Sequence, residues 1–227
     1  MKYVLKTMLM LVFSAGLALA DEDRLITVTG VGSVETVPDM AMLRLGVTHQ
    51  AEQAADAMAA TTEGVAAVLA RLEEAGVAAR DVQTDQLSLQ PVWSDYTSNN
   101  RRITGFAATN MLMVRVRDLD GLGRVLDLVI TDGANSFNGL SFGLQDPKPA
   151  QDAARAAAVA DAVDRAEQLA AAAGVPLGAI QTISEHGGGA RPEMLNMPMA
   201  RSAADVPIAQ GEVSVMSQVN IVFAIAE

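Results

Sequence analysis

The sequence contains no cysteine, only two histidines and few aromatic residues. The lack of cysteine excludes disulfides, thiol nucleophiles, thiolate metal sites and an anchor attached to a lipidated cysteine. The histidines, His49 and His186, lie far apart in the sequence, so a zinc site would have to recruit carboxylates such as Glu52 or Glu185. We therefore expect two surface histidines and no metal or other cofactor.

Basic residues are also scarce. The chain has 16 lysines and arginines against 27 aspartates and glutamates, which gives a formal net charge of −11 at pH 7. A surface of this charge repels phosphate backbones and anionic lipid headgroups. We therefore expect neither a nucleic-acid partner nor binding to a membrane surface.

Residues 1–20 have the pattern of a secretory signal peptide. Lys2 and Lys6 precede a short apolar stretch, and Ala18-Leu19-Ala20 supplies the small residues that signal peptidase accepts before Asp21. The apolar stretch is too short to span a bilayer as a mature helix. We predict cleavage before Asp21, a periplasmic location and no membrane insertion afterwards; a retained N-terminal anchor is the alternative.

Hydrophobic periodicity predicts a mixture of strands and helices. Apolar residues three and four apart predict a long helix from Ala54 that ends at Gly76, a short helix between Asp118 and Gly133, and a second long helix that ends at Gly174. Its expected stripe of small residues is Ala153, Ala156, Val159, Val163, Ala166 and Ala170. Alternating residues predict strands over residues 25–34, 40–47, 82–93, 103–117, 137–145, 179–185 and 212–225.

These elements indicate an α+β fold. We expect two related β/α units that form an antiparallel or mixed sheet, packed on one face by the two long helices, with one short helix besides. Ala75-Gly76-Val77 followed by Val82-Gln83-Thr84 returns as Ala173-Gly174-Val175 followed by Ile180-Gln181-Thr182, at the same displacement. Such an echo is typical of a supersecondary unit used twice. We therefore predict one internally duplicated domain over residues 21–227.

Gly30-Val31-Gly32 has the beginning of a dinucleotide-binding loop. The third glycine of that motif is replaced by Glu35, and Val37-Pro38-Asp39 stands where the helix should begin. No helix N-terminus would then face a pyrophosphate. We interpret these glycines as part of a twisted or bulged strand.

The segment Gly139-Leu140-Ser141-Phe142-Gly143 matches the nucleophile elbow of serine hydrolases. Asp161 or Asp164 and then His186 follow it in the chain order of a catalytic triad. The elbow requires a turn into a helix directly after the serine, whereas apolar residues go on alternating here. We expect Ser141 to lie on one face of a strand, and a serine hydrolase remains an alternative.

A methionine cluster, Met194, Met197 and Met199, lies in a segment without sustained periodicity, residues 186–210. Thioethers are suitable ligands for Cu(I), so a periplasmic copper-binding protein is a further alternative. A loop with apolar contacts, or a sacrificial oxidation site, explains the same residues.

Taken in order, several segments resemble one family over almost the whole mature chain. They are residues 26–32, 37–41, 90–93, 103–106 and 139–142, Asp146, the alanine-rich stretch 153–173, and Leu177-Gly178 before Ile183-Ser184-Glu185. In this set the chain resembles the SIMPL domain family of YggE-like periplasmic proteins. The segment after Glu185, where that family is least consistent, carries this chain's own glycine- and methionine-rich insert.

The resemblance implies a non-enzymatic envelope protein connected with oxidative-stress defence. It also implies a homo-oligomer, which in some relatives is a large ring, and it leaves room for an envelope protein as partner. It supplies no catalytic, cofactor or metal residues. On this resemblance, the pattern from Gly139 to Gly143 is a strand signature.

Overall fold

The computed structural model describes residues 24–94, 102–131, 133–186 and 208–226. The predicted signal peptide, residues 1–20, lies outside this part of the chain, as do Met194, Met197 and Met199. No helix in the described part is long and apolar enough to cross a membrane.

The described residues form seven strands, three α-helices and one short 3-10 helix, which confirms the α+β class. In chain order these are β1 (Leu25–Thr36), β2 (Met40–Ala51), α1 (Ala54–Glu74), η1 (Ala79–Asp81), β3 (Val82–Trp93), β4 (Ile103–Val116), α2 (Leu122–Thr131), β5 (Ser136–Gly143), α3 (Lys148–Ala173), β6 (Leu177–His186) and β7 (Val213–Ile225). The predicted long helices are α1 and α3, and the predicted short helix is α2.

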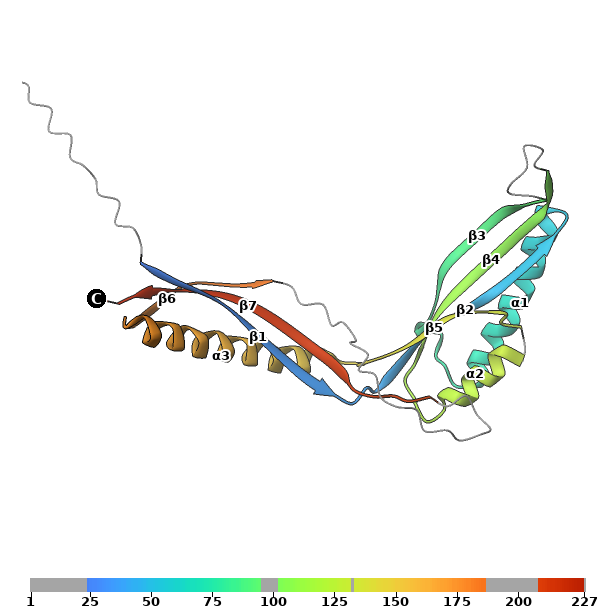
Figure 1. Ribbon diagram of the computed structural model, residues 1–227. Coiled ribbons are helices and arrows are strands. Elements are labelled where there is room, and N and C mark those ends of the chain that lie inside the picture. Colours follow the sequence, from blue (N-terminus) through green and yellow to red (C-terminus); the bar gives the residue numbers. More distant parts are fainter. Residues whose placement is uncertain (1–23, 95–101, 132, 187–207, 227) are drawn as a thin grey trace, which may run out of the picture.

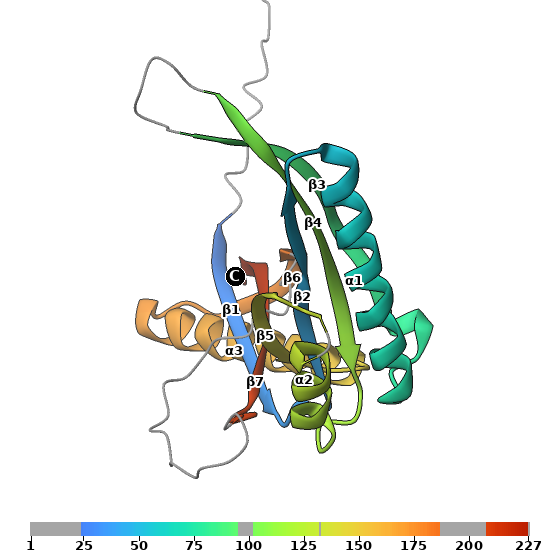
Figure 2. The ribbon, with the colours of Figure 1, turned by 90° about the vertical axis from the view of Figure 1, so that its right-hand side faces the viewer.

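The strands form two antiparallel sheets, with orders β3-β4-β2-β5 and β1-β7-β6. Figure 1 shows the two sheets at opposite ends of an elongated molecule. Helices α1 and α2 cover the four-stranded sheet, whereas α3 covers the three-stranded sheet (Figures 1 and 2).

This arrangement corrects the expectation of one sheet with both long helices on the same face. Each long helix has a sheet of its own, because β7 pairs with β1 and β6 and with no strand of the other sheet among the described residues. The two helices also differ in the size of the side chains that they bury, so each needs a matching surface.

Helices α1 and α2 bury branched side chains against the four-stranded sheet. Leu45 and Val47 of β2 meet Val68 and Leu72 of α1 and Val129 of α2 in one core. The spacing of the α1 and α2 residues, three and four apart, puts them on one helix face. Burying such side chains is the main favourable contribution to folding at this end of the molecule.

Helix α3 buries alanine instead. Its buried residues recur every four positions and so form one narrow stripe: Ala154, Ala158, Ala162, Ala166 and Ala170. The predicted stripe was shifted, since Ala153 and Ala156 are exposed and only Ala166 and Ala170 of the expected alanines are buried. A stripe of methyl groups lets the helix axis come close to a sheet whose residues on that face also have small side chains or none.

Gly30 and Gly32 of β1 face the alanine stripe of α3 and have no side chains. A Cβ added to Gly30 would lie 2.6 Å from the backbone nitrogen of Ala162, and one added to Gly32 would lie 2.8 Å from the Cβ of Ala157. The pairing of β1 with β7 runs without a register shift. The glycines therefore serve close packing of α3. Of the expected twisted or bulged strand, the bulge is wrong, because the register is continuous.

Both long helices end near a glycine in the left-handed region, as predicted. Gly76 has φ +85° after α1, and Gly174 has φ +68° as the C-cap of α3. Residues with a Cβ rarely adopt this conformation. After each glycine comes the edge strand of a sheet, β3 or β6. The echoed segments thus have corresponding positions, and their origin by duplication stays a prediction.

Candidate functional site

One face of the three-stranded sheet lies opposite α3, and the described side chains over its central part carry no charge. Along β1 the residues alternate, because Val28, Gly30 and Gly32 are buried toward α3 while their neighbours are exposed. The strand register places the matching residues of β7 and β6 beside those neighbours. We call this surface the open face: Thr27, Thr29, Val31, Ser33, Thr182, Ser184, Met216, Gln218, Asn220 and Val222.

The free edge of β1, next to the open face, is closed by two side chains of α3. The backbone N–H of Val31 donates to Asp161 Oδ2 at 2.8 Å, and Arg165 Nη1 donates to the carbonyl oxygen of Thr29 at 3.1 Å. Arg165 Nε also donates to Asp161 Oδ1 at 3.0 Å. The Val31 N–H, followed by Arg165, holds the pKa of Asp161 below its ordinary value, since both stabilise the carboxylate. Another strand cannot pair with β1 here without displacing this pair.

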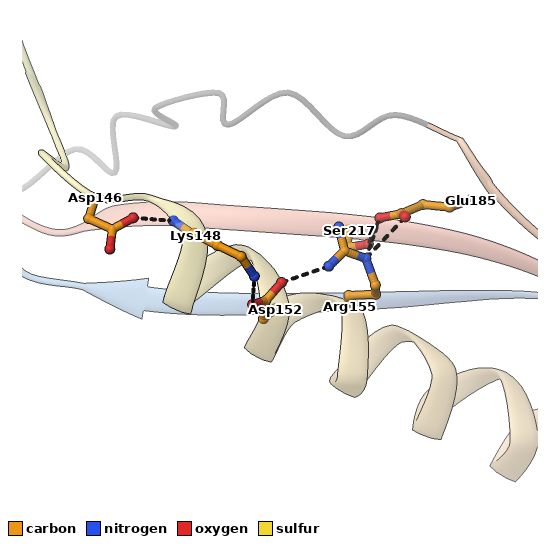
Figure 3. Close-up of polar contacts among 6 residues, drawn as sticks. All are labelled: Asp146, Lys148, Asp152, Arg155, Glu185 and Ser217. Carbon is orange, nitrogen blue, oxygen red and sulfur yellow. Dashed lines mark hydrogen bonds and ion pairs between the residues drawn. The ribbon is translucent and has the colours of Figure 1, made fainter.

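A row of charged side chains joins α3 to β6 and β7 on the opposite side of the sheet from the open face (Figure 3). Arg155 Nε donates to both oxygens of Glu185, at 2.9 and 3.0 Å, and Ser217 Oγ donates to Glu185 Oε1 at 3.3 Å. Asp152 accepts from Lys148 and from Arg155 Nη1. Glu185 raises the pKa of Arg155, and Lys148 lowers that of Asp152. This row attaches the helix to its sheet.

One of the carboxylates considered as metal ligands has an arginine as its partner. Glu185 is paired with Arg155, and His49 lies on β2 with its Nε2 facing Gly64 of α1. His186 is the last residue of β6. Among the described residues, no three histidine, aspartate or glutamate side chains form a group that could hold a metal ion.

Ser141 lies within β5, as the alternation predicted. It pairs with Met42 of β2, and the next helix starts only at Lys148, so the turn of a nucleophile elbow is missing. Asp161 is engaged by Val31 and Arg165. In the described part of the chain, the hydrogen bonds join Ser141 to neither Asp161 nor Asp164.

A second polar site, which the sequence analysis missed, surrounds Asp81 at one end of the four-stranded sheet. The Asp81 side chain is only 3% exposed, and Arg117 binds both of its oxygens, with Nε–Oδ2 at 2.8 Å and Nη2–Oδ1 at 2.7 Å. Arg115 and Arg80 approach the same carboxylate to 3.7 and 3.9 Å. Hydrogen bonding to Arg117 is the main reason why the pKa of Asp81 is lowered. In the sequence, the two arginines on either side of Val116, Arg115 and Arg117, were the signal that could have indicated this site.

Comparison with known proteins places the chain in a family. Residues 26–223 match the SIMPL model, whose description is "Protein of unknown function (DUF541)". The 26 kDa periplasmic immunogenic protein of Brucella melitensis biotype 1 is 41% identical over 214 residues, which cover 88% of this chain and 84% of the relative. YggE of Escherichia coli strain K12, named an uncharacterized protein, is 31% identical over 202 residues, or 87% and 82% of the two chains. The chain therefore belongs to the SIMPL family, as its sequence pattern predicted.

Proposed function

We propose that this chain is an exported protein of the bacterial periplasm that acts by binding or by homo-oligomeric assembly, and not by catalysing a reaction. The relative from Brucella is named a periplasmic protein, which supports the location. The positions of Ser141 and Asp161 give no support to a hydrolase, because Asp161 is committed to the edge of β1.

The open face is the observation that carries this proposal. Two copies of a chain with a net charge of −11 repel each other, and the repulsion is smallest where neither copy presents charge. The exposed side chains of Thr27, Thr29, Val31 and Ser33 offer hydroxyl and methyl groups on a regular β surface. Such a surface suits contact with a second sheet, whereas the β1 edge beside it is closed by Asp161 and Arg165.

Light scattering coupled to size-exclusion chromatography of the exported protein tests the assembly. The variant Thr27→Lys/Ser33→Lys puts two charges on the open face, and we expect it to elute as a smaller species than the wild type. Ala66→Lys/Ala70→Lys places the same charges on exposed positions of α1 and is the matched control. A wild-type protein that stays monomeric at high concentration, or an equal mass for both variants, would count against this function.

We further propose that the assembled protein contributes to oxidative-stress defence, the role that the resemblance to YggE-like periplasmic proteins implies. A strain that lacks the gene should survive peroxide less well than its parent. The wild-type gene should restore survival, and the Thr27→Lys/Ser33→Lys gene should not, provided that both proteins accumulate to the same level. Equal survival of the deletion strain and its parent would contradict this role.

A further inference from the structure

We propose that the pocket beside Asp81 binds a small phosphate-type oxyanion through Arg80 and Arg115. The residues that line the pocket come from the end of β4, the segment after the C-terminal end of α1 and the start of α2. Figure 2 shows these parts of the backbone near one another. The pocket belongs to the four-stranded sheet and not to the open face. The inference is therefore independent of the function proposed above.

The pocket is large enough to hold a small anion together with water. Its volume is about 240 Å³, below the range of drug-sized ligand sites but several times the share of one water molecule in the liquid. Val77, Val116 and Val125 line it together with the charged residues, so part of its wall is apolar. A polar ligand in such a place is less well screened by water than on the open surface.

The carboxylate of Asp81 does not use the donors of Arg80 and Arg115. Arg117 already binds both Asp81 oxygens in a two-pronged arrangement. Arg80 and Arg115 lie 3.9 and 3.7 Å from the nearest Asp81 oxygen, beyond hydrogen-bond distance. Within the described part of the chain, these ion pairs are the contacts that the two guanidinium groups make. Their N–H donors are available to a ligand, and Asp81 keeps the two cations near each other.

Two guanidinium groups with unused N–H donors favour an anion with several oxygens. Each guanidinium carries five N–H donors, in a fork that matches two oxygens of a phosphate or a carboxylate. One carboxylate can satisfy one fork, whereas a phosphate, with charge about −1.5 to −2 at pH 7, can accept from both. Gly121, which directly precedes α2, also lines the pocket. The partial positive charge of the helix N-terminus adds to that of the arginines.

The negative charge of Asp118 repels an anionic ligand in the pocket. Asp118 lines the same pocket, and its Oδ1 accepts the N–H of Asp120 in the turn before α2. Three arginines against two aspartates leave the pocket positive, on a chain that is strongly negative as a whole. Removing the Asp118 charge should therefore strengthen binding. An asparagine can still accept the N–H of Asp120 in the same turn.

Calorimetric titration of the exported protein with inorganic phosphate tests the proposal, with glycerol phosphate, sulfate and acetate as comparison ligands. We expect saturable binding of a phosphate ligand, weaker binding of sulfate, and still weaker binding of acetate. Arg80→Gln/Arg115→Gln should reduce phosphate affinity by about tenfold or more, and Asp118→Asn should increase it severalfold. A higher affinity for glycerol phosphate than for inorganic phosphate would identify a phosphate monoester as the ligand. A higher affinity for inorganic phosphate would identify the free anion.

A matched control is Arg44→Gln/Arg155→Gln, which also removes two positive charges. Both residues lie in ion pairs outside the pocket, Arg44 with Asp85 and Arg155 with Glu185. This variant should bind phosphate as the wild type does. Absence of saturable phosphate binding to the wild type would overturn the proposal. So would equal losses in the two double variants, or an unchanged affinity in Arg80→Gln/Arg115→Gln.

Discussion

Gly30 of β1 and Ala162 of α3 pack backbone against backbone, so that a Cβ on Gly30 would lie 2.6 Å from the Ala162 nitrogen. The carbonyl oxygen of Ala158 would be closer still. Neither is the movable end of a side chain, so a larger residue at position 30 has to move the helix. The close approach of α3 to its sheet therefore depends on this glycine.

Gly30→Ala should lower the free energy of unfolding by about 3 kcal/mol, because overpacking against backbone cannot be relieved locally. Urea denaturation followed by circular dichroism would measure the loss. Gly123→Ala is the control: Gly123 lies in α2 with nothing within 4 Å of an added Cβ. That change should raise the free energy of unfolding by up to about 1 kcal/mol through helix propensity. Equal effects of the two substitutions would refute the packing argument.

Asp161→Asn should make the protein less sensitive to acid. The pKa of Asp161 is lowered in the folded state, first by the Val31 N–H and then by Arg165. A lowered pKa contributes stability above the ordinary value of about 4, and this contribution is lost as the pH falls through the folded-state pKa. Melting temperatures of the wild type and the variant should therefore differ at pH 7 and converge in acid. A constant difference across this range would contradict the assignment.

Asp81→Asn should destabilise the four-stranded sheet. The substitution removes the charge that Arg117 binds at 2.7 and 2.8 Å, and we expect a loss of about 2 kcal/mol in the free energy of unfolding. Asp85→Asn is the comparison, because Asp85 also pairs with an arginine, Arg44, but is 25% exposed against 3% for Asp81. Its loss in urea denaturation should be clearly smaller. If Asp85→Asn lowered the free energy of unfolding as much as Asp81→Asn does, burial of Asp81 would not explain the loss.

Gly174→Ala should cost about 1 kcal/mol in the free energy of unfolding, because position 174 has φ +68°. Apart from the adjacent residues, no atom of the described part of the chain lies within 4 Å of an added Cβ, so the cost comes from the backbone conformation and not from a clash. Gly174→Asn should cost less, since asparagine tolerates the left-handed region better than alanine does. Thermal denaturation of the two variants would show whether the order holds.

Local patterns in the sequence were sufficient for the secondary structure. The glycines after α1 and α3 mark the ends of these helices, and alternation placed β5 across Ser141. These features depend on neighbours in the chain. The phase of the buried stripe of α3 was predicted less well, because valines at 159 and 163 drew the expected face to one side of the alanines that are buried.

The division into two sheets depends on contacts between distant residues. Strand β7 is apolar enough to suit either sheet, and its pairing with β1 and β6 has no local signature. The same holds for the polar sites. Arg165 and Asp161 lie four residues apart in α3, but their hydrogen bonds to Thr29 and Val31 join segments more than 100 positions apart. Asp81 and Arg117 likewise meet only because β3 and β4 pair.

The strand order β1-β7-β6 has a consequence for the newly made chain. The middle strand of this sheet is the last one to be synthesised, so β1 and β6 have no partner until residue 225 has been made. All strands of the other sheet lie between residues 40 and 143 and can pair earlier. A chain that ends before β7 would keep its four-stranded sheet but leave α3 without a complete sheet to cover. The exposed α3 would then be a target for proteases.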